Sequence, residues 1–115
     1  MGAKEQAEYL FSRIGWGREN AVMRPANTQV DRILRRLVET WNWIDGNAPI
    51  INVGGGYYKP RGWIPAEVIE YRKYRARDDA RKRSLDMKGC MMDKNFFEYS
   101  DSFHDEGYEQ LSLPV

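Results

Sequence analysis

The sequence predicts one small α+β domain, built from helices and a single β-hairpin and followed by an extended acidic tail. Three observations predict this class. A regular apolar stripe runs through residues 28–44, three consecutive glycines separate two runs of strand-forming residues, and the last part of the chain is acidic and aperiodic. A chain of 115 residues suits one domain. We place this domain at residues 1–88 and the tail at residues 89–115.

The first two helices are indicated by apolar residues that recur every three or four positions. In residues 4–14 these are Ala7, Leu10, Phe11 and Ile14. In residues 28–44 they are Val30, Ile33, Leu34, Leu37, Val38, Trp41 and Ile44. The segment between contains Pro25, which leaves room for one short turn at most. Asn27 or Thr28 is expected to cap the second helix.

The stretch PIINVGGGYYKP predicts a tight hairpin across residues 49–59. Isoleucine, valine and tyrosine favour strands, and the glycines between them supply the positive φ angles that a hairpin turn needs. We expect Gly54 and Gly55 at the turn. A phosphate-binding loop is not favoured, because such a loop is followed by a Lys-Ser or Lys-Thr pair and a helix, whereas here Tyr57 and Tyr58 follow.

A third helix is predicted from Pro65 to about Asp86, with proline at a typical first helical position. Its apolar stripe is thin and its second half is almost entirely polar, so we expect that half to project or to pack lightly. From Gly89 onward the periodicity fades, and the segment is expected to be partly docked or disordered.

The residues typical of catalytic and metal sites are scarce. His104 is the single histidine and Cys90 the single cysteine, so neither a closed zinc site nor an internal disulfide is expected. Cys90 also lacks neighbours that would mark a nucleophile. The sequence therefore predicts no enzyme activity, no metal and no cofactor. It has no apolar run that would span a bilayer and no apolar leader, which favours a reducing cytosol without a membrane partner.

Charge is distributed unevenly along the chain. Residues 1–83 hold sixteen Lys and Arg against ten Asp and Glu, whereas residues 84–115 hold two against seven. A basic body favours an anionic partner, although the two parts could also simply solubilise the chain or attract each other. The order helix, short turn, long helix, hairpin, helix is that of a winged helix-turn-helix, in which a basic helix enters the major groove and the hairpin touches phosphates.

The side chains suited to contact double-stranded DNA lie on the second helix and at the end of the hairpin. They are Gln29, Arg32, Arg35, Arg36, Lys59 and Arg61. The alternative, an ordinary solvated helix face, is left open by these residues alone.

Two of these segments resemble known proteins. The stretch GRENAV and the stretch APIINVGGGYYKP are similar to the opening and the wing of small winged-helix proteins from prophages of Gram-positive bacteria. The resemblance covers about residues 5–83 and implies a winged-helix fold with a role in phage DNA replication or regulation. The segment MRPANT departs from the pattern, since it is too short for the first helix of a helix-turn-helix. Docking in the major groove and a protein-binding scaffold both stay open.

The chain ends on a second motif, QLSLPV. It resembles the peptide with which bacterial replication and repair proteins bind the β sliding clamp, and every position fits that pattern: Gln110, Leu111, Ser112, Leu113, Pro114 and Val115. The leucines and valine suit an apolar pocket, glutamine fixes the register by hydrogen bonds, and proline lowers the ordering cost. The alternative is that the leucines pack onto the chain's own domain.

The sequence thus predicts a phage or mobile-element accessory protein that binds the sliding clamp and modulates DNA replication in the host cytosol. Two other functions stay open. One is a DNA-binding transcription regulator whose tail is incidental. The other is an inhibitor of a host defence or replication enzyme, with an acidic aromatic tail that imitates nucleic acid. The oligomeric state is not predicted.

Overall fold

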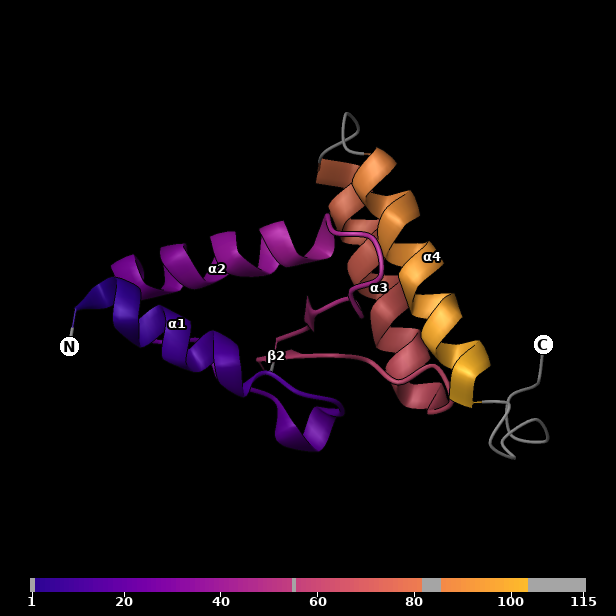
Figure 1. Ribbon diagram of the computed structural model, residues 1–115, viewed down its shortest axis with the longest axis horizontal. Helices are drawn as coiled ribbons and strands as arrows, with labels where there is room; N and C mark the ends of the chain where they lie inside the picture. The colour runs from indigo at the N-terminus through magenta and orange to yellow at the C-terminus, as the bar shows by residue number, and fades with distance from the viewer. Residues whose placement is uncertain (1, 55, 82–85, 104–115) are drawn as a thin grey trace.

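A computed structural model describes residues 2–54, 56–81 and 86–103. Its elements are α1 (Ala3–Arg13), a 3₁₀ turn η1 (Arg18–Asn20), α2 (Thr28–Asn42), β1 (Ile51–Asn52), β2 (Tyr57–Tyr58), α3 (Pro65–Arg81) and α4 (Asp86–Phe103). Helices α1 and α2 lie together, α3 and α4 run side by side, and the hairpin lies between the two pairs (Figure 1). Four α-helices and one antiparallel hairpin in the described residues confirm the predicted α+β class.

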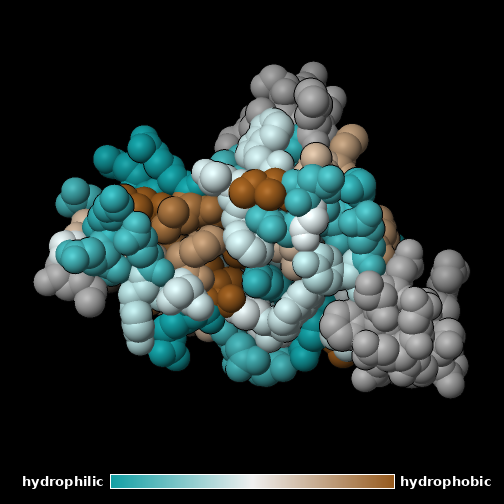
Figure 2. All heavy atoms as spheres, viewed as in Figure 1, coloured by the Kyte–Doolittle hydropathy of each residue, from teal (hydrophilic) through white to brown (hydrophobic). Residues whose placement is uncertain are grey.

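Helix α2 begins where the sequence predicts. The side chain of Asn27 accepts hydrogen bonds from the backbone N–H groups of Gln29 and Val30, at 2.9 and 3.0 Å, and so caps the helix. Behind this cap most of the apolar stripe packs against α1 in a first core cluster, whose buried members are Ala7, Ile14, Val30, Leu34, Val38, Ile50 and Tyr57. Ile44, the last residue of the predicted stripe, lies beyond the end of α2 and is 48% exposed. Hydrophobic residues also form a band over α1 and α2 on the face that Figure 2 shows, bordered by hydrophilic residues.

The hairpin is shorter than the predicted residues 49–59, but its partners are fixed. Ile51 lies opposite Tyr58 and Asn52 opposite Tyr57. The other edge of β2 is covered by the segment before α2, because Val22 and Tyr57 exchange two backbone hydrogen bonds of 2.9 and 2.8 Å. Side chains alternate across a strand, so Tyr57 joins the first cluster while Ile51 and Tyr58 face the second.

The second core cluster lies between the hairpin, α3 and α4, and consists of Ile51, Tyr58, Tyr71, Met92 and Phe96. The rings of Tyr71 and Phe96 are stacked with their centroids 4.1 Å apart. Arg75 adds an ion pair to Asp93, with Nε 2.9 Å from Oδ1. The second half of α3 therefore packs against α4 up to this point.

The prediction of an extended tail from residue 89 is wrong over residues 89–103, which belong to α4. The sequence pattern did not predict this helix, because two of its buried residues, Lys88 and Asn95, are polar. The ammonium of Lys88 lies 2.9 and 2.8 Å from the two carboxylate oxygens of Glu39. Asn95 accepts from the N–H of Gly46 and donates to the carbonyl of Ile44. Paired in this way, polar groups can be buried at positions where a sequence pattern reads them as solvated.

Helix α3 is described as far as Arg81, and the stretch from there to the predicted end near Asp86 lies outside the described residues. The predicted domain boundary between residues 88 and 89 falls within α4. Over the described residues, no helix combines the length and the apolar composition that crossing a bilayer requires.

Candidate nucleic-acid interface

A hollow of about 450 Å³ lies between α2, β1 and α3. We call it the arginine pocket, because five of the residues that line it are arginines: Arg24, Arg32, Arg35, Arg36 and Arg77. Glu39 is the one acidic residue on the described wall, and its carboxylate is paired with Lys88. The pocket therefore presents an excess of positive charge, as a site for an anion does.

Three separate parts of the chain supply these arginines. Arg32, Arg35 and Arg36 lie on the face of α2 opposite its buried stripe, because residues three and four apart share one side of a helix. Arg24 comes from the segment before α2. Arg77 comes from α3, and its Nη2 donates to the backbone carbonyl of Asn52 at 3.1 Å, which ties α3 to the hairpin.

Asp31 orients the arginines on one side of the pocket. Its two carboxylate oxygens accept from Nε and Nη2 of Arg24, at 3.3 and 2.8 Å, and Nε of Arg35 lies 3.6 Å away. The bonds from Arg24 hold the pKa of Asp31 below its usual range and raise the pKa of Arg24. Arg32 and Arg36 are exposed and form no ion pair with any described residue. Their charge is therefore available to an outside anion.

The pocket wall also contains two neutral polar groups. The side-chain oxygen of Asn52 and the hydroxyl of Tyr57 are buried, and neither makes a well-formed hydrogen bond within the described residues. Burial raises the pKa of the Tyr57 hydroxyl, and the negative charge of Asp31 raises it further. Asn52 lies opposite Tyr57 in the hairpin, and its side chain is close enough to lower the pKa of the Tyr57 hydroxyl, although less than the other effects shift it. Tyr57 is therefore protonated at neutral pH and has a hydrogen to donate.

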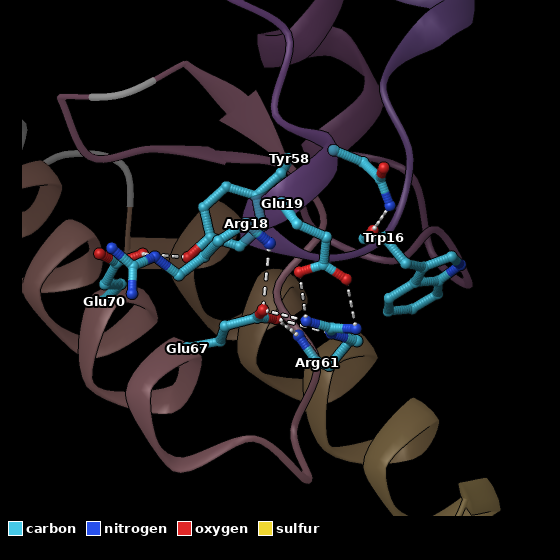
Figure 3. Close-up of polar contacts among 8 residues, drawn as sticks. Trp16, Arg18, Glu19, Tyr58, Arg61, Glu67 and Glu70 are labelled. Carbon is cyan, nitrogen blue, oxygen red and sulfur yellow. Dashed lines mark hydrogen bonds and ion pairs between the residues drawn. The ribbon is translucent and has the colours of Figure 1, made fainter.

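Arg61 lies away from the arginine pocket and is held by two carboxylates (Figure 3). Its guanidinium reaches Glu67 at 2.6 Å and Glu19 at 2.8 Å. Glu67 is 1% exposed and also accepts from the backbone N–H groups of Arg61 and Arg18, at 2.8 and 3.1 Å. The hydrogen bond with Glu67 raises the pKa of Arg61. This arginine joins η1, the end of the hairpin and α3.

The remaining predicted contacts are dispersed. The ammonium of Lys59 lies 4.9 Å from the centroid of the Trp41 ring, and burial lowers the pKa of Lys59. Gln29 is exposed in the first turn of α2 and is not part of the pocket wall. The structure thus brings Arg32, Arg35 and Arg36 together and leaves Gln29, Lys59 and Arg61 apart from them.

Sequence reasoning missed the other seven described residues that line the pocket: Arg24, Val38, Glu39, Asn52, Tyr57, Tyr74 and Arg77. Arg24 and Asp31 are only seven residues apart and lie on either side of the start of α2. This short spacing is a weak local signal for their ion pair. Nothing local relates Arg77 to the hairpin, because that contact spans 25 residues. The clamp-like residues 110–115 lie outside the described residues.

The described residues contain no group of three or more His, Cys, Asp or Glu side chains arranged to hold a metal ion. Cys90 is exposed on α4. Searches of protein-family models, curated proteins and solved structures gave no match to this chain.

Proposed function

We propose that this protein binds nucleic acid, and that the arginine pocket contacts the phosphates. The observation that supports the proposal is the convergence of five arginines from three segments on one hollow. Arginine forms bidentate hydrogen bonds with phosphate oxygens and keeps its charge at any physiological pH. Each contact also releases counterions condensed on the nucleic acid, which favours association.

The order of elements supports a winged-helix version of this proposal. In that fold a helix followed by a hairpin presents both to DNA. Here α2 precedes the hairpin, its arginines face the same hollow as Asn52 of β1, and Val22 adds a third backbone segment beside β2. We propose that α2 and the hairpin form one basic surface, with Arg32 and Arg36 as its principal phosphate contacts.

The direct test is fluorescence anisotropy of a labelled 20-base-pair duplex titrated with the full-length protein at low salt. We expect binding that falls by about tenfold or more when Arg32 and Arg36 are both changed to glutamine, since each phosphate contact is a charge-assisted bond. The matched control is Arg72→Gln with Lys73→Gln, two exposed cations on α3 that do not line the pocket. Equal losses in both double variants, or no binding by the wild type, would overturn the proposal.

A second proposed function rests on the last six residues. We propose that QLSLPV binds the bacterial sliding clamp, so that the domain acts near the replication machinery of a phage or mobile element. Leu111 and Leu113 would supply most of the energy, since few residues dominate a small interface. Peptides of this kind bind with about micromolar affinity.

Titration of purified clamp with the full-length protein and its Leu113→Ala form tests the second proposal. Loss of most of the binding in Leu113→Ala supports it. Ser112→Ala is the control in the same segment, because a serine hydroxyl fills no apolar pocket. Indistinguishable binding of clamp by the wild type and Leu113→Ala would rule it out.

A further inference from the structure

The arginine pocket is concave, and its shape limits what it receives. A helix that reads the major groove must project into that groove. The arginine face of α2 instead forms one side of a hollow, with Asn52 of β1 and Arg77 of α3 among its other walls. Its volume of about 450 Å³ falls within the range of small-molecule pockets, about 300–1,000 Å³. A hollow of this size suits a small group, either one that projects from a nucleic-acid strand or a free small molecule.

The charges indicate where an anion would lie. Arg24 and Arg35 share Asp31, whereas Arg32 and Arg36 stand one helical turn apart with no described carboxylate between them. Like charges at this spacing repel each other. A phosphate between their guanidinium groups would remove the repulsion and accept hydrogen bonds from both.

The hairpin side of the pocket carries polar groups that suit a nucleobase. Tyr57 is 3% exposed, and its hydroxyl makes no well-formed hydrogen bond to any described residue. The groups that act on this hydroxyl are the charges of Asp31, Arg24 and Arg35 and the side chain of Asn52. The unbonded oxygen of Asn52 comes from the residue directly opposite in the hairpin. A hydroxyl donor beside an amide acceptor matches the edge of a nucleobase, which presents acceptors and amino donors side by side.

We infer that the arginine pocket holds one nucleotide unit, with its phosphate between Arg32 and Arg36 and its base edge toward Tyr57 and Asn52. The inference rests on the proposed function, because it names the part of a nucleic acid that the same pocket takes. Both polar atoms are shielded in the unliganded protein, so side chains of the wall must shift when the base enters. The unit comes either from an unstacked position in a single strand or from a free nucleotide.

Calorimetric titration of the full-length protein at low salt tests this with four probes: inorganic phosphate, dAMP, a ten-residue single-stranded oligonucleotide and a duplex. We expect dAMP to bind more tightly than inorganic phosphate, or the single strand to bind more tightly than the duplex. Preference for the single strand alone identifies a strand as the source, and tight binding of dAMP identifies a free nucleotide.

Tyr57→Phe removes one hydroxyl and is the decisive variant. We expect it to weaken binding of dAMP or the single strand by about three- to tenfold, the loss of one hydrogen bond, and to leave phosphate binding unchanged. Its melting temperature should change little, because the hydroxyl makes no well-formed hydrogen bond to Asn52 or to any other described residue. Arg36→Gln should weaken all probes, and Arg72→Gln none.

Two results would overturn the inference. One is a Tyr57→Phe variant that melts lower but binds every probe as the wild type does, since the hydroxyl would then serve Asn52 within the fold. The other is a wild type that binds duplex at least as well as single strand and dAMP no better than phosphate. Because duplex binding persists in that second case, the nucleic-acid function itself would stand; absence of binding to every nucleic acid would remove both.

Discussion

At the scale of single residues, Glu67 is a buried carboxylate that accepts four hydrogen bonds within the described residues, three from Arg61 and one from Arg18. Burial opposes its ionisation, but the bonds from the Arg61 side chain and from two backbone N–H groups outweigh that cost and hold the pKa of Glu67 below its usual value. A carboxylate buried with several donors is costly to disturb, because its partners are left without a charge to meet.

Changing Glu67 to Gln is expected to destabilise the protein by about 3 kcal/mol at neutral pH, as for removal of one partner of a buried pair. Since the folded-state pKa is depressed, this stabilisation is present above the unfolded-state pKa of about 4.3 and is lost as pH falls through the folded-state value. Urea denaturation at pH 7 and at pH 3 measures both effects, and the gap between wild type and variant should narrow at pH 3. Glu8→Gln, on the exposed side of α1, is the control. A gap that is the same at both pH values would contradict this account.

At the scale of elements, the sequence predicts the elements whose determinants lie close together in the chain and misses those that depend on distant contacts. The α2 helix could be predicted because its stripe and its Asn27 cap lie within the helix and the residue before it. The hairpin could be predicted because glycine and β-forming residues are adjacent in sequence. Helix α4 could not, because Lys88 and Asn95 find their partners about 50 residues away. The same division applies to the pocket, where three arginines of α2 were predictable and Arg77 was not.

The hairpin should respond differently to two glycine substitutions. Gly56 has φ 124°, and a Cβ there would lie 2.5 Å from the carbonyl oxygen of Val22. Gly54 has φ 85° with nothing within 4 Å. We expect Gly54→Ala to cost about 1 kcal/mol from backbone strain alone and Gly56→Ala at least about 2 kcal/mol. Thermal denaturation of the two variants measures both losses of stability. Equal losses would mean that the Val22 segment does not pack against β2.

Two adjacent phenylalanines test whether α4 is part of the fold. Phe96 is 3% exposed in the second core cluster, whereas Phe97 is 52% exposed. Phe96→Ala should cost about 3–5 kcal/mol through the cavity it leaves, and Phe97→Ala no more than about 1 kcal/mol. Chemical denaturation of both variants gives the comparison. Similar small losses would restore the prediction of a loosely docked tail.

At the scale of the whole molecule, the hairpin lies between two pairs of helices (Figure 1). The arginines of α2 and α3 line one hollow between these elements. The formal net charge of +1 does not reveal this concentration of charge. Electrostatic binding is governed by local charge, so a nearly neutral chain can still hold a phosphate site. Residues 104–115 lie outside the described part, and the clamp proposal rests on their sequence alone.

The central claim is that Arg32 and Arg36 contact phosphates, and the salt dependence of duplex binding tests it most directly. Each phosphate contact on duplex DNA contributes about 0.9 to the slope of log K against log salt. We predict that Arg32→Gln with Arg36→Gln makes this slope shallower by at least about 0.9, the contribution of one phosphate held by both arginines, while Arg72→Gln with Lys73→Gln leaves it unchanged. A slope in the pocket variant equal to that of the wild type would contradict the account.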